Sequence, residues 1–408
     1  MMSPCKELLD TSPTELMKCI GTDDVLYFDS SGNFPSSYKA PHSIIAVAPS
    51  RIIKGHISDL SELEDCLASH PQTTNTSTGY PAGGLAGWVD YEGAYTFGVF
   101  DKFWVYSHST QQWVHIGNPV HLNHAVSPPP YSINSGWQAQ TSQKEFIQAI
   151  TQAQEFIASG DIYQVNLSQQ FSTQVSTSGT LYGLYEKLRQ ASPAPMATYG
   201  KLGDTELLCS SPETFLDIQG DRIETRPIKG TSLRYPDKQR DLESANLLQK
   251  SPKEQAELVM ITDLLRNDLG QVCQYGSVTV DDLLKLESLE QVHHLVSTIS
   301  GTLNPEISHL KALQACLPGG SITGAPKLRS IDLIQKLEKR KRGLYTGVCG
   351  YVGFSGESQF NIIIRSLVRQ RDHLHYHVGA GIVADSDPLK EYEETLAKAL
   401  GIQRALAL

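Results

Sequence analysis

Two ionisable side chains near the ends of predicted strands could form an acid and nucleophile pair. Glu213 follows the apolar run Leu207-Leu208-Cys209, and Lys229 lies in the stretch Ile223–Thr231, whose pattern predicts a strand that runs into a turn. A carboxylic acid can protonate a leaving group, and a neutral amine can attack carbon. If the fold brings them together, Glu213 and Lys229 are candidates for these two roles. A structural ion pair is the competing interpretation.

Another acid, Glu257, stands one turn into a predicted helix whose other residues are mostly apolar. That composition predicts a helix buried on most sides. A carboxylate there needs a partner, because an unpaired buried charge is costly. The partner could be a metal ion, or it could be Arg266 or a distant lysine in a salt bridge. The residues alone favour the salt bridge.

The predicted C-terminal helix carries charged residues beside a glycine-containing strand. Its apolar stripe consists of Tyr392, Leu396, Ala399 and Leu400, and its opposite face of Glu391, Glu394 and Lys398. A solvated face with a Glu-Lys pair is the default interpretation. However, the strand just upstream contains Gly379-Ala380-Gly381, whose glycines let a ligand approach the backbone. The glycines of this neighbouring strand favour the interpretation that the charged face of the helix lines a ligand-binding site.

Residues 318–327 form a glycine-rich loop that superficially resembles a phosphate loop. A Walker sequence needs lysine directly after its second glycine, but Ala325 and Pro326 precede Lys327 here, which excludes nucleotide binding of that kind. Backbone amides at a helix N-terminus could still bind a carboxylate, and a tight structural turn explains the segment equally well.

Tyr345 and Arg365 lie on predicted strands, and a guanidinium leaving a buried strand usually binds a carboxylate.

The elements that must position these residues have clear boundaries. Ser142 and Glu145 form a capping box that begins a helix ending at Gly160, and an alternating strand follows over residues 163–168. Ser251 and Asp387, each followed by proline, begin helices that run to about residues 271 and 400. A further helix is expected from about residue 326 to 343. Short strands dominate the first ~140 residues. The mixture predicts an α+β class rather than a Rossmann fold or TIM barrel, since strands and helices do not alternate regularly.

Composition narrows the functional classes. The formal net charge is −10, which argues against nucleic acid and an anionic membrane as partners. Seven scattered cysteines without a CxxC pair are typical of reduced thiols in the cytoplasm. The N-terminus lacks the apolar core of a signal peptide, and no apolar run approaches the length of a membrane span.

Taken together, the ordered segments resemble the chorismate-binding enzymes, a family that includes anthranilate, aminodeoxychorismate, isochorismate and salicylate synthases. The resemblance is strongest over residues 143–405 and looser over residues 1–140, and it implies one domain over residues 1–408. It is carried by the following segments: residues 163–168, 211–213, 227–231, 263–268, 294–297, 320–327, 364–366, 379–381 and 391–398. The implied fold is a single domain with two antiparallel sheets packed orthogonally and helices outside.

The resemblance also implies roles for individual residues. Glu213 is implied to be the general acid and Lys229 the nucleophile, with Glu257 and Glu394 binding Mg²⁺. The remaining substrate-binding positions that it implies are Gly230, Thr231, His294, Tyr345, Arg365, Gly379, Ala380, Gly381 and Lys398.

In this family, the residue types at two positions determine which reaction a member catalyses. Members that activate water carry lysine where this chain has Gln164, and anthranilate synthases carry alanine where it has Lys229. The resemblance therefore implies the aminodeoxychorismate type, with anthranilate synthesis or a non-catalytic member as alternatives.

A glutaminase of the usual kind needs a Gly-x-Cys-x-Gly elbow, and the nearest candidate, residues 347–351, ends in tyrosine. We therefore expect a separate glutamine amidotransferase subunit, or use of free ammonia.

Overall fold

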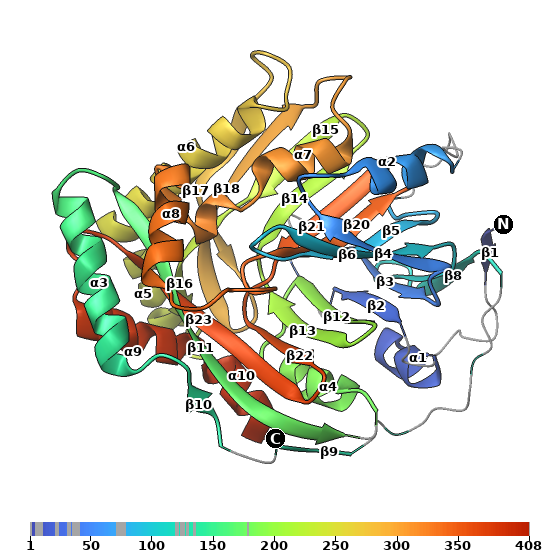
Figure 1. Cartoon of the computed structure of the whole chain (residues 1–408), viewed down its shortest axis with the longest axis horizontal. Coiled ribbons are helices and arrows are strands. Elements are labelled where there is room, and N and C mark those ends of the chain that lie inside the picture. The colour runs from blue at the N-terminus through green and yellow to red at the C-terminus, as the bar shows by residue number, and fades with distance from the viewer. Residues whose placement is uncertain are drawn as a thin grey trace.

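Two large antiparallel sheets form the centre of the molecule in the computed structural model (Figure 1). The structure describes residues 2–4, 11–20, 24–30, 34, 41–70, 79–118, 122, 127, 130–133, 136–177 and 179–407. Within these residues every strand pair is antiparallel. The sheets and outer helices confirm the predicted α+β class.

The first sheet has thirteen strands among the described residues. In spatial order they are β1 (Met2–Pro4), β8 (Gln112–Ile116), β7 (Phe103–Ser107), β3 (His42–Val47), β2 (Val25–Asp29), β12 (Met196–Leu202), β13 (Thr205–Ser211), β22 (Ser366–Gln370), β23 (His373–Ile382), β11 (Gln164–Thr177) and β10 (Gln138–Ala139), while β19 (Gly324–Ala325) and β9 (Tyr131–Ile133) also pair with β11.

The second sheet has ten strands in the same described part of the chain. Their order is β16 (Ile228–Leu233), β18 (Val292–Thr302), β15 (Arg222–Arg226), β14 (Thr214–Gln219), β21 (Glu357–Ile362), β20 (Val348–Gly353), β5 (Gly84–Val89), β6 (Ala94–Phe100) and β4 (Arg51–His56), with β17 (Thr279–Ser288) also on β18. Strands from before residue 120 thus enter both sheets, where β2 pairs with β12 and β5 pairs with β20.

Helices cover the outer faces of the sheets. They are α1 (Pro13–Cys19), α2 (Ser61–Ala68), α3 (Gln143–Ala158), α4 (Tyr182–Ala191), α5 (Lys238–Gln249), α6 (Pro252–Gly270), α7 (His309–Cys316), α8 (Lys327–Leu337), α9 (Pro388–Lys398) and α10 (Leu400–Ala407), and η3 (Gly320–Ile322) is a short 3-10 turn. No helix of the described residues is long and apolar enough to cross a bilayer.

Most of the predicted helix boundaries are confirmed. Ser142 and Glu145 form the expected capping box of α3, and Gly160, with φ of +80°, follows its C-cap. Ser251 and Asp387 cap α6 and α9 as predicted. The helix expected to continue to residue 343 was predicted too long, since α8 ends at Leu337.

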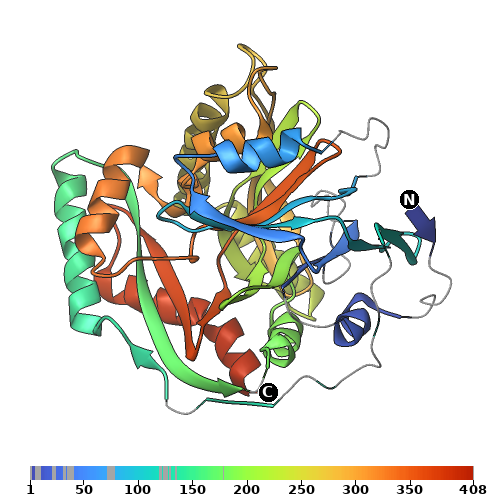
Figure 2. The same ribbon diagram turned by 45° about the vertical axis from the view of Figure 1, so that its right-hand side comes forward.

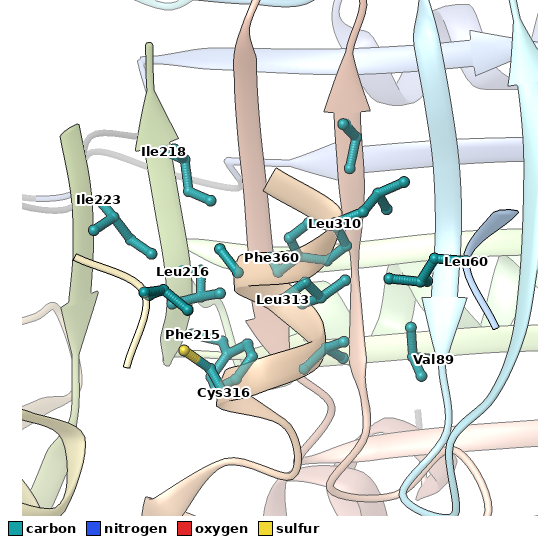
Figure 3. Close-up of a cluster of buried hydrophobic side chains, with 14 of the residues drawn as sticks. Leu60, Val89, Phe215, Leu216, Ile218, Ile223, Leu310, Leu313, Cys316 and Phe360 are labelled. Carbon is teal, nitrogen blue, oxygen red and sulfur yellow. The ribbon is translucent and has the colours of Figure 1, made fainter. Parts of the chain in front are cut away.

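The hydrophobic core is divided into layers by the two sheets. Alternate residues of β2 and β3, such as Leu26 and Ile44, pack against Trp88 and Tyr351 of the second sheet, which joins the two sheets. On the outer face of the second sheet, α2 and α7 lie side by side (Figure 2). Figure 3 shows Leu310 and Leu313 of α7 packed against side chains of β14 and β21. These layers fix the strands whose ends carry the candidate site.

Candidate active site

The candidate catalytic residues gather where the chain crosses between the two sheets. Glu213 lies between β13 and β14, and Arg365 lies between β21 and β22. Arg365 has a φ of +51°, an uncommon conformation for a residue other than glycine. The prediction that Tyr345 and Arg365 lie on strands was wrong, because both occupy turns that adjoin strands. Turns at the ends of strands can aim a side chain between two sheets, which a position within a strand would not allow.

Glu213 is held in a form that suits a general acid. Its side chain is 6% exposed, and burial raises the pKa of its carboxyl to about 7. Three effects act against burial: a hydrogen bond of 2.5 Å from Ser321 Oγ to Glu213 Oε1, and the positive charges of Lys229 and Arg365. Glu213 and Lys229 therefore interact electrostatically, and a substantial fraction of Glu213 is protonated near neutral pH.

Lys229 and its neighbours lie on β16, beside His294 of β18. A bulge between Lys229 and Thr231 interrupts the ladder, with Gly230 at a φ of +75°. Thr231 Oγ1 and His294 Nδ1 are 3.0 Å apart. Burial, and after it the Arg365 charge, lower the pKa of His294 to about 3, so this imidazole is neutral at physiological pH. Because of this bulge, Lys229 and Thr231 pair with Leu295 and His294, which are consecutive residues of β18.

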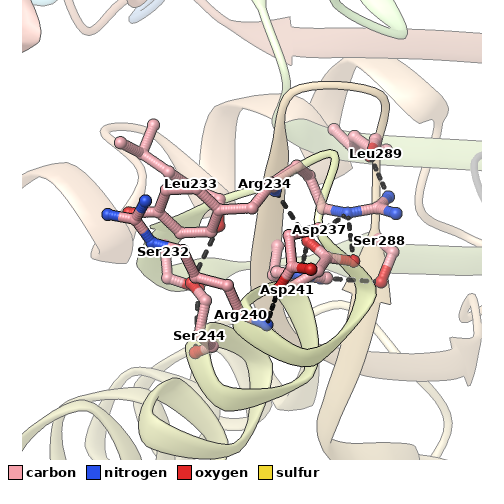
Figure 4. A network of polar contacts seen from close by, with 11 residues as sticks. Ser232, Leu233, Arg234, Asp237, Arg240, Asp241, Ser244, Ser288 and Leu289 are labelled. Carbon is pink, nitrogen blue, oxygen red and sulfur yellow. Dashed lines mark hydrogen bonds and ion pairs between the residues drawn. The ribbon is translucent and has the colours of Figure 1, made fainter.

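A polar network fixes the far end of β16 to α5 (Figure 4). Arg234 Nε donates to both carboxylate oxygens of Asp241, at 2.9 and 3.0 Å, and Arg234 Nη1 donates to the Leu289 carbonyl at 2.7 Å. Ser244 Oγ donates to the Leu233 carbonyl at 2.8 Å. Because charged hydrogen bonds are among the stronger ones, the strand that carries Lys229 is anchored at its outer end.

The paired strands β11 and β23 line the site with two glycines. Gly381 faces Asn166 in the ladder and Gly379 faces Ser168. A Cβ on Gly379 would come within 2.9 Å of both Asn166 Oδ1 and Tyr345 OH, and a Cβ on Gly381 would collide with Gln164 Nε2. Gly379 therefore lies against Tyr345, whereas Gly381 lies against Gln164. Ala380, between them, turns its methyl group into an apolar cluster with Phe146, so that only its backbone faces this side.

The two predicted metal ligands lie on α6 and α9, where further carboxylates join them. Lys229 Nζ is 3.9 Å from Glu257 Oε2, and Glu394 Oε1 is 2.8 Å from Lys398 Nζ. Lys398 Nζ also donates to the Gly379 carbonyl at 3.0 Å. The salt bridge expected from Glu257 is made by Lys229, whereas the Arg266 alternative was wrong, because Arg266 pairs with Asp263 at 3.0 Å. The prediction that α6 is buried on most sides was also wrong, since Val259 is 44% exposed.

Glu254 belongs to the same acidic group as Glu391 and was missed as a site residue, whereas Glu391 was named on the charged face of the C-terminal helix but not as a metal ligand. Burial opposes the ammonium form of Lys253, but the charges of Glu391, Glu257, Glu394 and Glu254 outweigh it and raise the pKa of that side chain. Burial, and then the Glu257 charge, raise the pKa of Glu254. The available signal was spacing, since Glu254 and Glu391 each stand three residues before a predicted ligand, on the same helical face.

The apolar stripe predicted for α9 needs correction. Glu391 is 4% exposed and accepts a hydrogen bond of 2.7 Å from Ser386 Oγ, whereas Leu400, expected in the stripe, begins α10 and is 46% exposed. The buried face of α9 runs through Glu391, Thr395 and Ala399. Hydrogen bonds to Glu391 and Thr395 allow polar residues on this face, which a count of apolar positions cannot detect.

The donor chemistry of this region fits the predicted magnesium ion. Within the described residues no group of three or more His, Cys, Asp or Glu side chains has the arrangement of a metal site. Nevertheless, Glu257 and Glu394 offer carboxylate oxygens, the ligands that a hard cation prefers. Three lysines form ion pairs with carboxylates of this group: Lys229, Lys253 and Lys398. The excess of carboxylates there would accommodate a cation.

The glycine-rich loop has a mainly structural organisation. η3 supplies Ser321 to Glu213, and β19 pairs with Gln164 and Val165 of β11. Lys327 is 12% exposed, lies 2.6 Å from Asp268 Oδ2 and donates to the Cys316 carbonyl at 3.1 Å. The loop therefore contributes to the site through Ser321, a residue that the sequence analysis did not select.

The sequence matches the family described as chorismate binding enzyme over residues 24–404. The chain belongs to the chorismate binding enzyme family. It is 42% identical over 270 residues to aminodeoxychorismate synthase component 1 of Bacillus subtilis (strain 168), covering 66% of this chain and 57% of that relative. It is 38% identical over 283 residues to anthranilate synthase component 1 of Streptomyces coelicolor, covering 69% of this chain and 55% of that relative. The chain thus spans less than two thirds of the length of these relatives.

A solved structure supports the same assignment. The fold is similar to the crystal structure of anthranilate synthase component I from Streptococcus pneumoniae TIGR4, with a TM-score of 0.76 and 26% identity, covering 89% of this chain and 92% of that one. Because relatives with two different reaction names resemble this chain at similar identities, membership of the family does not choose between the reactions.

Proposed function

We propose that this chain is the synthase component that converts chorismate and ammonia to 4-amino-4-deoxychorismate, in the supply of 4-aminobenzoate for folate. The observation that carries the proposal is the coupling of an amine to a protonated acid. Lys229 acts electrostatically on Glu213, whose pKa is about 7, and Lys229 Nζ lies beside Gly381 of the glycine-containing strand. An anthranilate-type member, with alanine in place of Lys229, would lack the amine.

The proposed reaction balances with these two groups alone. The neutral Lys229 amine bonds to C2 of chorismate while the C4–oxygen bond breaks, and the Glu213 proton leaves with the hydroxyl as water. Ammonia then bonds to C4 while the C2–Nζ bond breaks and the electron pair returns to Lys229. The new ammonium group gives its proton to the Glu213 carboxylate. The net change is chorismate plus ammonia to amino product plus water, with the enolpyruvyl group retained.

The other residues bind and orient the substrate in this proposal. Tyr345, Arg365 and the Gly379–Gly381 backbone hold the enolpyruvyl carboxylate, while Gly230, Thr231, His294 and Lys398 position the rest of the molecule. Glu257 and Glu394 hold Mg²⁺, which when bound neutralises the ring carboxylate. The neutral state of His294 suits a hydrogen-bonding role rather than a charge-pairing role.

The nitrogen source is proposed to be a separate glutamine amidotransferase subunit. The relatives named component 1 are each one part of a synthase by that name. Cys349, the nearest candidate for a glutaminase nucleophile, is 1% exposed within β20, and burial raises its thiol pKa well above the usual value. Buried, unpaired thiols such as Cys66 and Cys316 also fit the reducing cytoplasm.

A product assay tests the proposal against its closest alternative. The full chain is incubated with chorismate, MgCl₂ and ammonium chloride, and the products are identified by mass spectrometry. We expect 4-amino-4-deoxychorismate, which yields 4-aminobenzoate only after a lyase is added, and no activity with glutamine alone. The alternative is anthranilate synthase, favoured by the 38% identity to a relative of that name. Formation of fluorescent anthranilate together with pyruvate would show that the chain is an anthranilate synthase instead.

A further inference from the structure

Arg342 carries a positive charge in the interior of the protein. Its side chain is 1% exposed and is the largest fully buried side chain of the described residues. Glu338 balances the charge, because Arg342 Nη2 donates to Glu338 Oε1 at 2.7 Å and Nε donates to Oε2 at 2.9 Å. Apolar packing often stabilises a fold as well as a buried ion pair does, so stability alone does not explain an arginine here. The other atoms that the guanidinium binds indicate a second role.

One end of the guanidinium holds the short turn η3 against β11. Arg342 Nη1 donates to the Ile322 carbonyl at 3.0 Å, and Nη2 donates to the Asn166 carbonyl at 2.7 Å. Ser321, the residue before Ile322, donates the hydrogen bond of 2.5 Å to Glu213 Oε1. The placement of the Ser321 hydroxyl on the candidate general acid therefore depends on the contacts of Arg342.

The same guanidinium also holds the turn that carries Tyr345. Arg342 Nη1 donates to Thr346 Oγ1 at 3.3 Å, and its centre lies 6.0 Å from the centre of the Tyr345 ring. Thr346 has a φ of +60°, an outlying conformation for a β-branched residue. Such a backbone conformation persists only where neighbouring groups hold it in place. The direction in which Tyr345 points therefore depends on Arg342 as well.

We propose that Arg342 is a positioning residue that fixes Glu213 and Tyr345 relative to one another, so that the general acid meets a substrate held by its enolpyruvyl carboxylate. This inference rests on the proposed function, in which Tyr345 binds that carboxylate and Glu213 protonates the departing hydroxyl. Arg342 acts through these two residues. Its planar fork of N–H donors reaches two carbonyls, a hydroxyl and a carboxylate at once, which the single ammonium group of lysine cannot do.

The test removes the buried ion pair as a whole. A double variant, Arg342→Met with Glu338→Gln, leaves no unpaired charge in the interior. The glutamine keeps an acceptor oxygen for Ser168 N, which donates to Glu338 Oε1 at 2.7 Å. The matched control is Arg369→Met with Glu206→Gln, which removes a second guanidinium–carboxylate pair, 3.2 Å apart, between β22 and β13.

The full chain and its variants are assayed with chorismate, MgCl₂ and ammonium chloride over a range of pH. Loss of chorismate gives kcat and KM, and mass spectrometry identifies the product. In the Arg342 double variant we expect the KM for chorismate to rise about tenfold and kcat to fall about tenfold, because both groups are displaced. The pH above which kcat falls, about 7 in the original chain, should rise by about 0.5–1 unit, because the Ser321 hydrogen bond that lowers the pKa of Glu213 is weakened. The control should lower stability in urea and leave the pH profile unchanged.

Arg342→Lys separates geometry from charge and serves as well if the double variant does not fold. It keeps the positive charge beside Glu338 but loses the fork, so we expect the same changes in KM and pH profile with most of the stability retained. Recovery of original kinetics in Arg342→Lys would show that charge alone matters. A fall in kcat with an unchanged pH profile, or unchanged kinetics in folded double variant, would also overturn the positioning role. Failure of the original chain to consume chorismate would instead refute the proposed function beneath it.

Discussion

Replacing Glu213 with glutamine should make the protein more stable above neutral pH while removing its general acid. Glutamine mimics the protonated carboxyl, which is the form that the buried environment of Glu213 favours. The Ser321 hydroxyl, 2.5 Å from Glu213 Oε1, can donate to the glutamine carbonyl in the same way. The Glu213→Gln variant therefore keeps the hydrogen bond and removes only the ionisation.

The size and pH range of the effect follow from the pKa shift. Burial raises the pKa of Glu213 from 4.5 to about 7, which corresponds to about 3 kcal/mol. The folded state thus binds the proton more tightly than the unfolded state. The contribution of Glu213 to stability is full below pH 4.5 and is lost as pH rises towards 7. The variant should match the original chain at pH 4.5 and exceed it by about 3 kcal/mol at pH 8.

Urea unfolding of both proteins at several pH values measures this difference directly. The same samples should show a reduction of roughly 100-fold or more in turnover of chorismate, since general acid catalysis contributes 10²–10⁴. For the original chain, kcat should also fall as pH rises above about 7. A stability difference that does not depend on pH would show that Glu213 ionises normally, and full activity of Glu213→Gln would refute its role as the acid.

Three further predictions concern the nucleophile, the metal and the glycines. Lys229→Ala should remove at least 99% of amino product formation, measured by mass spectrometry, because addition at C2 loses its amine. Glu257→Gln and Glu394→Gln should each raise the Mg²⁺ concentration needed for half-maximal activity about tenfold or more, whereas EDTA should abolish activity. Gly381→Ala should reduce kcat/KM for chorismate at least tenfold through the collision with Gln164, while Gly270→Ala, which meets nothing within 4 Å, should not.

Matched controls separate these effects from loss of folding. Glu393→Gln changes an exposed carboxylate on the same helix as Glu394 and should leave the Mg²⁺ requirement unchanged. Lys201→Ala, on β12, should retain amino product formation. Equal Mg²⁺ dependence in Glu257→Gln and the original chain would remove Glu257 from the metal site, and continued amino product from Lys229→Ala would remove the covalent step.

The helix starts of this protein could be predicted because the residues that cap each helix lie next to one another in the sequence. The capping box of α3 and the Ser251-Pro252 start of α6 are complete within a few residues. The end of α8 was missed because residues after Leu337 serve a distant partner. Glu338 Oε1 accepts a hydrogen bond of 2.7 Å from Ser168 N, and Arg342 donates to the Asn166 carbonyl. Such tertiary hydrogen bonds override helix propensity and leave no periodic pattern.

The site was predictable in its parts but not in its assembly. Residue types and spacing made Glu213, Lys229 and the glycines candidates, each acid with a structural alternative, and resemblance to a family implied their roles. The structure resolves one alternative in an unexpected way, because the salt bridge of Glu257 is made by Lys229, the proposed nucleophile. The two interpretations of Glu257 are therefore not exclusive: the contact that looks structural joins two residues of the same site.

This contact suggests why the site combines a lysine nucleophile with an acidic group. Lys229 Nζ lies 3.9 Å from Glu257 Oε2, so the proposed nucleophile faces a proposed metal ligand. A divalent cation bound by Glu257 would compete with Lys229 for that carboxylate, and the amine would lose its ionic partner as the metal arrives. Metal binding and release of the Lys229 side chain from Glu257 would then be linked, whereas a lysine paired with a carboxylate outside the metal site would keep its partner in every state.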